Sequence, residues 1–300
     1  MPHSALVTHR SAPASDTPLL GRTALVTGVS RRRGIGYAVA SAFARRGAHI
    51  VIHHHRAHDE GQPWGADDLD AVRDGIRSQL VPGAELVDIG ADLSDAAAIP
   101  RVIEAAAAIT GSIEILVCNH ARSGGDGSIL DMTPETLDAF WDVNTRATLL
   151  LTSAFAARHH APAEPRRPGD RIAGGGPYAG PTGHVFWMTS GQIHGPMRGE
   201  VAYATSKAAL AGVTTTVAAE LLELGIVLNT IDPGPVNTGY LDAETADRDL
   251  EGLDARVAGT PFGRFGRPED PAALISWLAS PEGSWVVGQV ISSDGGFQLA

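Results

Sequence analysis

The sequence predicts a single-domain α/β fold in which one doubly wound parallel sheet of seven strands carries helices on both faces. Short apolar runs alternate with helical patterns along most of the chain, and parallel neighbours need such crossovers, which are right-handed and usually helical. The composition agrees, because 43% of the 300 residues are hydrophobic while only 5% are aromatic. A core of small aliphatic side chains is typical of strands that helices bury on both faces.

The expected strands are the short apolar runs, and the expected helices are the longer segments with apolar residues at helical spacing. The first strand, at 23–26, runs into a glycine-rich segment, and Gly47 closes the helix at 37–46 that follows. The other strands are expected at 49–53, 85–89, 113–118, 184–190, 226–231 and 285–291. The other helices are expected at 67–80, 95–109, 134–158, 201–223 and 268–279. This alternation leaves no second domain to place within residues 21–300.

Three segments depart from the alternation. Residues 1–20 are polar at their start and contain no apolar run of signal-peptide length, so we expect a flexible N-terminal extension. Residues 159–182 are rich in Pro, Gly and Arg and enter a strand, which predicts a surface insertion at the amino edge of the sheet. Residues 234–267 follow the carboxyl end of a strand, where open α/β sheets bind ligands, and are expected to form a substrate lid.

Composition and charge argue against several classes of protein. The formal net charge is −11 and no long stretch is basic, which argues against nucleic-acid binding. Cys118 is the only cysteine, so an internal disulfide and a multi-cysteine zinc site are excluded, and a reducing cytoplasm is favoured. No apolar run approaches the ~20 residues that span a membrane. The run His53-His54-His55 lacks Glu or Cys at ligand spacing, which favours a solvated strand end and no metal site.

A glycine-rich turn follows the first strand and opens the first helix. Gly28, Gly34 and Gly36 would let a pyrophosphate approach the backbone, where helix N–H groups bind it. The alternative is that Gly34 and Gly36 only permit tight packing of helix on strand. Arg56 stands twenty residues beyond Gly36, where an NAD site usually has an acid, and no carboxylate precedes Asp59. With the arginines of the turn, this pattern favours NADP(H) over NAD(H).

A tyrosine and a lysine four residues apart begin a predicted helix. Tyr203 and Lys207 therefore lie one turn apart on the same face. A neighbouring ammonium favours the phenolate form and would bring the pKa of the phenol from ~10 toward working pH, so the phenol could donate or accept a proton. Ser190, thirteen residues upstream at the carboxyl end of a strand, can place a hydroxyl beside the phenol. Together these residues predict a proton-transfer site.

From about Arg22 to Phe297 the chain resembles the short-chain dehydrogenase/reductase family, and closely its 3-oxoacyl-ACP-reductase-like members, which have a Rossmann-type fold. The resemblance rests on the glycine-rich turn, on the Ser190, Tyr203 and Lys207 spacing, and on segments 91–93, 115–121, 143–144, 232–238 and 288–296. It implies that Tyr203 is the general acid/base, that Lys207 binds the nicotinamide ribose, that Ser190 bonds the substrate oxygen and that Asn144 holds a water relaying protons to Lys207.

The resemblance also implies which residues bind the cofactor. Gly28, Gly34, Ile35 and Gly36 would line the pyrophosphate, Asp92 and Leu93 the adenine, Asn119 the adenosine-side ribose, and Pro233, Gly234, Val236 and Thr238 the nicotinamide end. The turn has five residues between Gly28 and Gly34 where the family has three. This length leaves open which of Ser30, Arg31, Arg32 and Arg33 meets the phosphates, and Ser30 and Arg33 are taken as the expected contacts. The usual Asn-Asn-Ala-Gly of the family is Cys118-Asn119-His120-Ala121 here.

The expected function is that of an oxidoreductase transferring hydride between NADP(H) and a carbonyl or secondary alcohol, with NAD(H) as the alternative cofactor. The substrate would be a small molecule or a carrier-bound acyl group, and the family implies a homotetramer. An enoyl reductase is a close alternative. Sequences that resemble enoyl reductases have a Tyr-x₆-Lys spacing, however, and this chain has Tyr-x₃-Lys. The alternative from another class is a nucleotide-binding regulator without turnover. The presence of a complete proton relay argues against it, because a protein that only binds a nucleotide does not need Ser190, Tyr203, Lys207 and Asn144 together.

Overall fold

The computed structural model describes residues 16–160, 167, 169–246 and 250–299. Its strands are β1 (Thr23–Val26), β2 (His49–His54), β3 (Leu86–Gly90), β4 (Ile115–Cys118), β5 (Gly183–Met188), β6 (Ile226–Asp232) and β7 (Val290–Ser292). Its α-helices are α1 (Ile35–Arg45), α2 (Arg56–Glu60), α3 (Leu69–Arg77), α4 (Ala98–Ala107), α5 (Pro134–Phe140), α6 (Ala147–His159), α7 (Val201–Leu222), α8 (Glu251–Ala258) and α9 (Glu269–Leu278).

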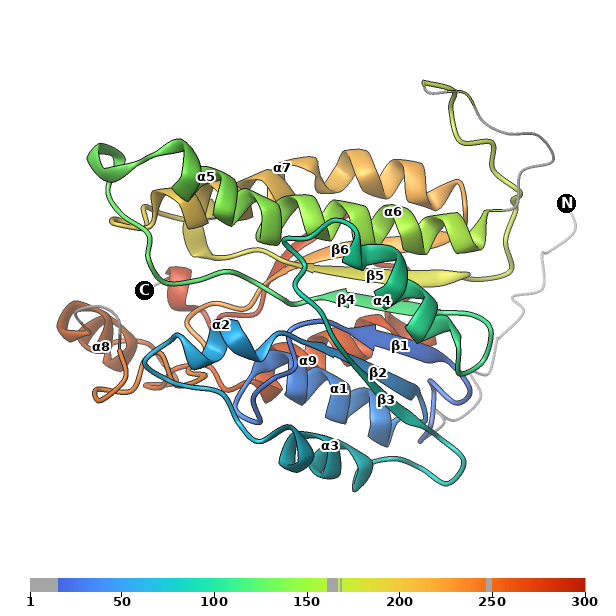
Figure 1. Cartoon of the computed structure of the whole chain (residues 1–300), viewed down its shortest axis with the longest axis horizontal. Helices are drawn as coiled ribbons and strands as arrows, with labels where there is room; N and C mark the ends of the chain where they lie inside the picture. The colour runs from blue at the N-terminus through green and yellow to red at the C-terminus, as the bar shows by residue number, and fades with distance from the viewer. Residues whose placement is uncertain (1–15, 161–166, 168, 247–249, 300) are drawn as a thin grey trace, which may run out of the picture.

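The strands form one parallel sheet in the order β3-β2-β1-β4-β5-β6-β7. Helices α1, α3 and α9 cover one face and α4, α6 and α7 the other (Figure 1). The order reverses beside β1, so the ligand crevice of such a sheet is expected at the carboxyl ends of β1 and β4. The predicted doubly wound, Rossmann-type sheet is confirmed.

Both faces of the sheet are buried, which explains why its strands read as continuous apolar runs. Val26 and Ile52 point into the layer formed with α1 and α9. Leu25 and Val51, their neighbours in the chain, point into the layer formed with α4 and α6. Since successive strand side chains alternate between faces, a strand buried on one face only would have alternated apolar with polar residues.

Four elements differ from the sequence prediction. The last strand starts at Val290 and not at 285, because the preceding residues form a turn in which Gly288 has φ +70°. The helix expected at 134–158 contains a π-helical turn at Trp141–Arg146, between α5 and α6. The short helices α2 and α8 were not predicted. Helix α2 matters most, because it lies at the carboxyl edge of the sheet (Figure 1).

The expected extension at 1–20 lies mostly outside the described residues, but Leu19, near its end, is fully buried in the core. Of the expected insertion at 159–182, residues 161–166 and 168 also lie outside. Its described part leads to the amino end of β5, and the Tyr178 hydroxyl donates to the Glu223 carbonyl (2.8 Å). Among the described residues, no helix combines the length and apolar character that crossing a membrane requires.

Candidate active site

A cavity of about 1190 Å³ opens at the carboxyl ends of the strands, where the topology predicts a ligand. It is lined by segments that follow β1 through β6. The predicted site residues that line it are Gly28, Ser30, Gly34, Ile35, Asp92, Leu93, Asn119, Ser190, Tyr203, Lys207, Pro233, Gly234, Val236 and Thr238. Four other predicted residues, Arg33, Gly36, Arg56 and Asn144, are not among the lining residues.

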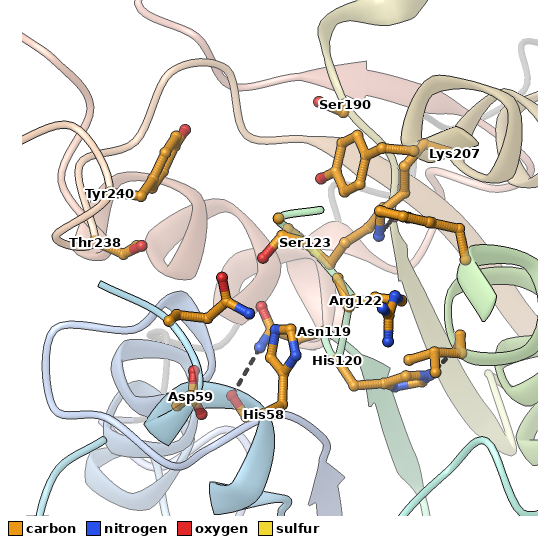
Figure 2. Close-up of a pocket in the computed structure, with 18 of the residues that line it drawn as sticks. His58, Asp59, Asn119, His120, Arg122, Ser123, Ser190, Lys207, Thr238 and Tyr240 are labelled. Carbon is orange, nitrogen blue, oxygen red and sulfur yellow. Dashed lines mark hydrogen bonds between the residues drawn. The ribbon is translucent and has the colours of Figure 1, made fainter. Parts of the chain in front are cut away.

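The predicted Ser, Tyr and Lys come together at one end of the cavity. Ser190 follows β5, while Tyr203 and Lys207 lie in the first two turns of α7. The Lys207 ammonium donates to the Met188 carbonyl (2.9 Å) and lies 5.7 Å from the centroid of the Tyr203 ring. Burial lowers the pKa of Lys207 to about 8. Figure 2 shows Ser190 and Lys207 on the side of the cavity opposite Thr238 and Tyr240.

Asn144 is fully buried in the π-helical turn between α5 and α6. Its side-chain amide donates to the Ser206 hydroxyl (2.9 Å) and the Arg122 carbonyl (3.2 Å), and its side-chain oxygen accepts from the Arg122 N–H (2.6 Å). These bonds tie the loop after β4 to α7, one residue before Lys207. The side chain thus makes protein contacts, and the water relay expected of Asn144 stays a prediction. A π-turn at this position fits the frequent use of such turns at functional sites.

The glycine-rich turn approaches the end of β4 so closely that side chains would not fit. Gly28 has φ +72°, and a Cβ there would lie 2.8 Å from the His120 Cα. A Cβ on Gly36 would lie 2.7 Å from the Asn119 amide nitrogen. That amide donates to the carbonyls of Thr27 and Gly28 (3.1 Å each). Gly36 therefore serves packing, whereas Gly34 and Ile35 bring the N-terminus of α1 to the cavity wall.

Arg31 is the arginine of the turn that lines the cavity. Its guanidinium donates to the Thr238 carbonyl (2.6 Å), pairs with Asp59 (3.2 Å) and lies 5.6 Å from the Trp64 ring centroid. Arg33, the predicted phosphate ligand, instead pairs with Asp242 (2.7 Å) and is mostly exposed. Arg32 is also mostly exposed and pairs with Asp67 (3.5 Å). Spacing alone did not identify which of the three arginines faces the cavity.

Helix α2 begins at Arg56, whose contact with the cofactor stays a prediction. The Arg56 guanidinium pairs with Glu60 one turn on (2.8 Å) and lies outside the cavity lining. The same helix brings Asp59 into the cavity wall, where its carboxylate accepts from the Ser30 hydroxyl and pairs with Arg31. The sequence pattern indicated no acidic residue before Asp59. It did not predict that Asp59 itself lies in a short helix and contacts the glycine-rich turn.

The sequence pattern predicted a solvated strand end at His53-His54-His55, but only His55, with 40% of its side chain exposed, fits that expectation. His53 is 2% exposed and bonds the Ala91 carbonyl (2.9 Å), while His54 pairs with Asp88 (3.1 Å). His120 bridges the Thr27 hydroxyl (2.7 Å) and the Val143 carbonyl (3.0 Å). Burial lowers the pKa of His53 to about 4 and that of His120 to about 3, so both rings are neutral near pH 7.

Other predicted cofactor contacts lie at the two ends of the cavity. Asp92 and Leu93 follow β3, and the Asp92 carboxylate accepts from the Ser94 N–H (2.8 Å). Pro233 precedes the segment expected as a lid, and Gly234, Val236 and Thr238 lie at its start. Tyr240 continues this wall and meets Trp64 edge-to-face (6.3 Å between centroids). The segments at 59–64 and 233–240 thus meet over the glycine-rich turn, held by Arg31.

The chain is similar to known proteins in sequence and in fold. Residues 22–249 match the family described as short chain dehydrogenase. The chain is 32% identical to the uncharacterized oxidoreductase YjdA of Bacillus subtilis, over 92% of this chain and 96% of that protein. It is also 32% identical to an NADPH-dependent aldehyde reductase-like protein of Arabidopsis thaliana, over 97% and 99%. A solved short chain dehydrogenase from Burkholderia cenocepacia in complex with NADP superposes with a TM-score of 0.73, at 30% identity over 93% of this chain and 99% of that one.

Proposed function

Because the chain belongs to the short-chain dehydrogenase/reductase family and is thus an NAD(P)-dependent oxidoreductase, we propose that it transfers hydride between NADP(H) and a carbonyl or secondary alcohol. The observation that carries the proposal is the meeting of Ser190, Tyr203 and Lys207 at one end of a cavity. Tyr203 acts as general acid/base. The substrate is a small carbonyl or alcohol compound, or an acyl group on a carrier.

The residues of the cavity fit a dinucleotide. The N-terminus of α1 supplies backbone N–H groups beside Gly34, and Gly28 permits the close approach of the turn. Asp92 and Leu93 would hold the adenine end, and Pro233 to Thr238 the nicotinamide end. When bound, the nicotinamide supplies or accepts the hydride.

The chain's own residues handle the proton and the orientation. In the reductive direction Tyr203 donates its hydroxyl proton to the substrate oxygen, and Ser190 donates a hydrogen bond to the same oxygen. The buried Lys207, held by the Met188 carbonyl, places a positive charge near the phenol and stabilises the negative charge that develops there. In the oxidative direction the same phenol oxygen accepts the proton.

The proposed reaction is tested with a panel of ketones, aldehydes and secondary alcohols, measuring the absorbance of the reduced cofactor. We expect turnover of at least one class of carbonyl compound, because the cavity carries the groups that proton transfer needs. Reduction of carbon–carbon double bonds without any reduction of carbonyls would instead favour an enoyl reductase. Cofactor binding without turnover of any panel member would favour a nucleotide-binding regulator.

We predict that NADPH binds more tightly than NADH. Support comes from the NADPH-dependent relative, from the neighbour in complex with NADP, and from Arg31 in the cavity wall. In Arg31→Ala, NADPH affinity should fall about tenfold and NADH affinity much less, since a 2′-phosphate accepts charge-assisted bonds that a 2′-hydroxyl does not. Fluorescence titration of both cofactors measures this.

Arg33→Ala is the matched control, because that arginine belongs to the same turn but pairs with Asp242 on the exterior. Its cofactor affinities should stay within about twofold of the unmodified protein. An unmodified protein that binds NADH as tightly as NADPH would contradict the preference. Equal losses of both cofactors in Arg31→Ala would show that Arg31 binds a part common to the two.

We also propose that the protein self-associates, with the tetramer as the expected state. The surface carries large apolar side chains that a monomer would leave in water: Ile129 is 71% exposed, Leu130 92% and Trp285 95%. Size-exclusion chromatography with light scattering should give a mass near four chains. A monomer at micromolar concentration would contradict this proposal and leave the assignment of the site untouched.

A further inference from the structure

The first turn of α7 is capped by a distant loop. The N-cap residue, Glu200, makes no side-chain capping bond to the helix. Instead, the Val201 N–H donates to the Gly127 carbonyl (3.2 Å), and the Asp126 carboxylate accepts from the N–H groups of Ala202 (3.1 Å) and Tyr203 (2.7 Å). The first bond within the helix runs from the Ala204 N–H to the Glu200 carbonyl (2.8 Å). Residues 126 and 127 thus satisfy the free donors that begin the helix.

The loop that carries Asp126 is itself fixed. It follows β4 and lines the cavity as far as Asp126. Gly124 (φ +76°) and Gly125 (φ +68°) adopt a left-handed backbone that turns the chain toward α7. The Gly127 N–H donates to the same carboxylate (2.7 Å), so Asp126 accepts bonds from both sides of the junction.

The Asp126 carboxylate therefore contacts the backbone of Tyr203, the proposed proton donor. One of its two oxygens bonds the backbone N–H of Tyr203 itself, and the other bonds the residue before it. The bonds are charge-assisted, and a negative charge is favoured at a helix N-terminus. The Tyr203 ring meets the buried Phe140 edge-to-face (6.4 Å between centroids), which restrains its other side.

We propose that Asp126 is a positioning residue for the proton donor: by capping α7 it fixes the start of the helix, and with it the place of the Tyr203 phenol relative to the substrate oxygen. The inference rests on the proposed function, since it assigns Asp126 a part in proton transfer. Misplacement of a reacting group by about 1 Å can cost on the order of 10²-fold in rate. A carboxylate that acts through the backbone of Tyr203 can thus control turnover.

The test compares Asp126→Ala and Asp126→Asn with the matched control Asp68→Ala. Asp68 also caps a helix, accepting from the Asp70 N–H (3.1 Å), but it caps α3 outside the cavity lining. We expect kcat to fall about ten- to hundredfold in Asp126→Ala, with the Kd of the cofactor within about twofold. Asp126→Asn keeps one acceptor oxygen and the shape of the side chain, so its kcat should lie between those of Asp126→Ala and the unmodified protein.

Amide hydrogen exchange of the peptide covering 201–207 gives a readout that needs no substrate. Exchange should be faster in Asp126→Ala than in the unmodified protein, and unchanged in Asp68→Ala. Equal exchange in all three proteins would overturn the cap. Faster exchange with kcat within about twofold of the unmodified protein would overturn the positioning role. If the unmodified protein reduces no carbonyl compound, the proposed function fails, and exchange still decides whether Asp126 caps α7.

Discussion

Tyr203→Phe is expected to lower turnover about 10²–10⁴-fold while the Kd of the cofactor stays within about twofold. The phenylalanine keeps the ring that packs edge-to-face on Phe140. It also keeps the backbone N–H that donates a hydrogen bond to the Asp126 carboxylate. Only the hydroxyl is lost, and with it the proton that the substrate oxygen receives. Steady-state rates with any accepted carbonyl compound, together with fluorescence titration of NADPH, separate chemistry from binding.

Two further substitutions sharpen this result. Ser190→Ala should lower turnover less than Tyr203→Phe, since it removes a hydrogen bond to the substrate oxygen and no proton donor. Tyr178→Phe is the control, because Tyr178 lies at the other end of the sheet and bonds the Glu223 carbonyl. Its rate should equal that of the unmodified protein. A Tyr203→Phe protein that keeps the unmodified rate would remove the phenol from the mechanism.

The order of strands and helices was predictable because it depends on periodicity and on the rule for parallel crossovers. All seven expected strands are present, and the segments Thr23–Val26 and Ile226–Asp232 match nearly residue for residue. Short elements were missed. Helix α2 has five residues and no apolar face, and its position is set by contacts of Asp59 with Ser30 and Arg31. Such contacts between distant segments leave no local pattern in the sequence.

Some residues of the candidate site could likewise be predicted from the sequence, and others could not. Tyr203 and Lys207 could be placed together because a helix fixes residues four apart, and Ser190 because it ends a strand of the same sheet edge. Arg31 and Asp126 could not be identified. The bond from the Ala202 N–H to the Asp126 carboxylate joins residues 76 positions apart, through a loop whose path depends on two left-handed glycines. The pairing of Arg56 with Glu60 could not be predicted either, because both residues belong to a helix that the sequence pattern did not indicate.

Lys207→Met should abolish most turnover and also weaken cofactor binding. The ammonium is proposed both to hold the nicotinamide ribose and to stabilise the developing phenolate, so losing it affects binding and chemistry together. Methionine keeps the length of the side chain in a buried site. Tyr203→Phe, by contrast, should affect chemistry alone. Equal cofactor affinity in Lys207→Met and the unmodified protein, measured by the same titration, would contradict the ribose contact.

The same substitution should change how the stability of the cofactor-free protein depends on pH. Burial lowers the pKa of Lys207 from 10.5 to about 8 in the folded state, so the unfolded chain binds more protons between these values and stability rises with pH there. This gain in the free energy of unfolding, on the order of 3 kcal/mol by the usual conversion, is fully present above the unfolded pKa and is lost as pH falls through the folded one.

Urea unfolding at about pH 7 and about pH 10 measures this gain. The free energy of unfolding should increase more between the two pH values in the unmodified protein than in Lys207→Met. Groups that titrate identically in both proteins cancel in this comparison. Equal increases would show that the ammonium is solvated in the folded protein and lacks the buried position from which its effect on the phenol is argued.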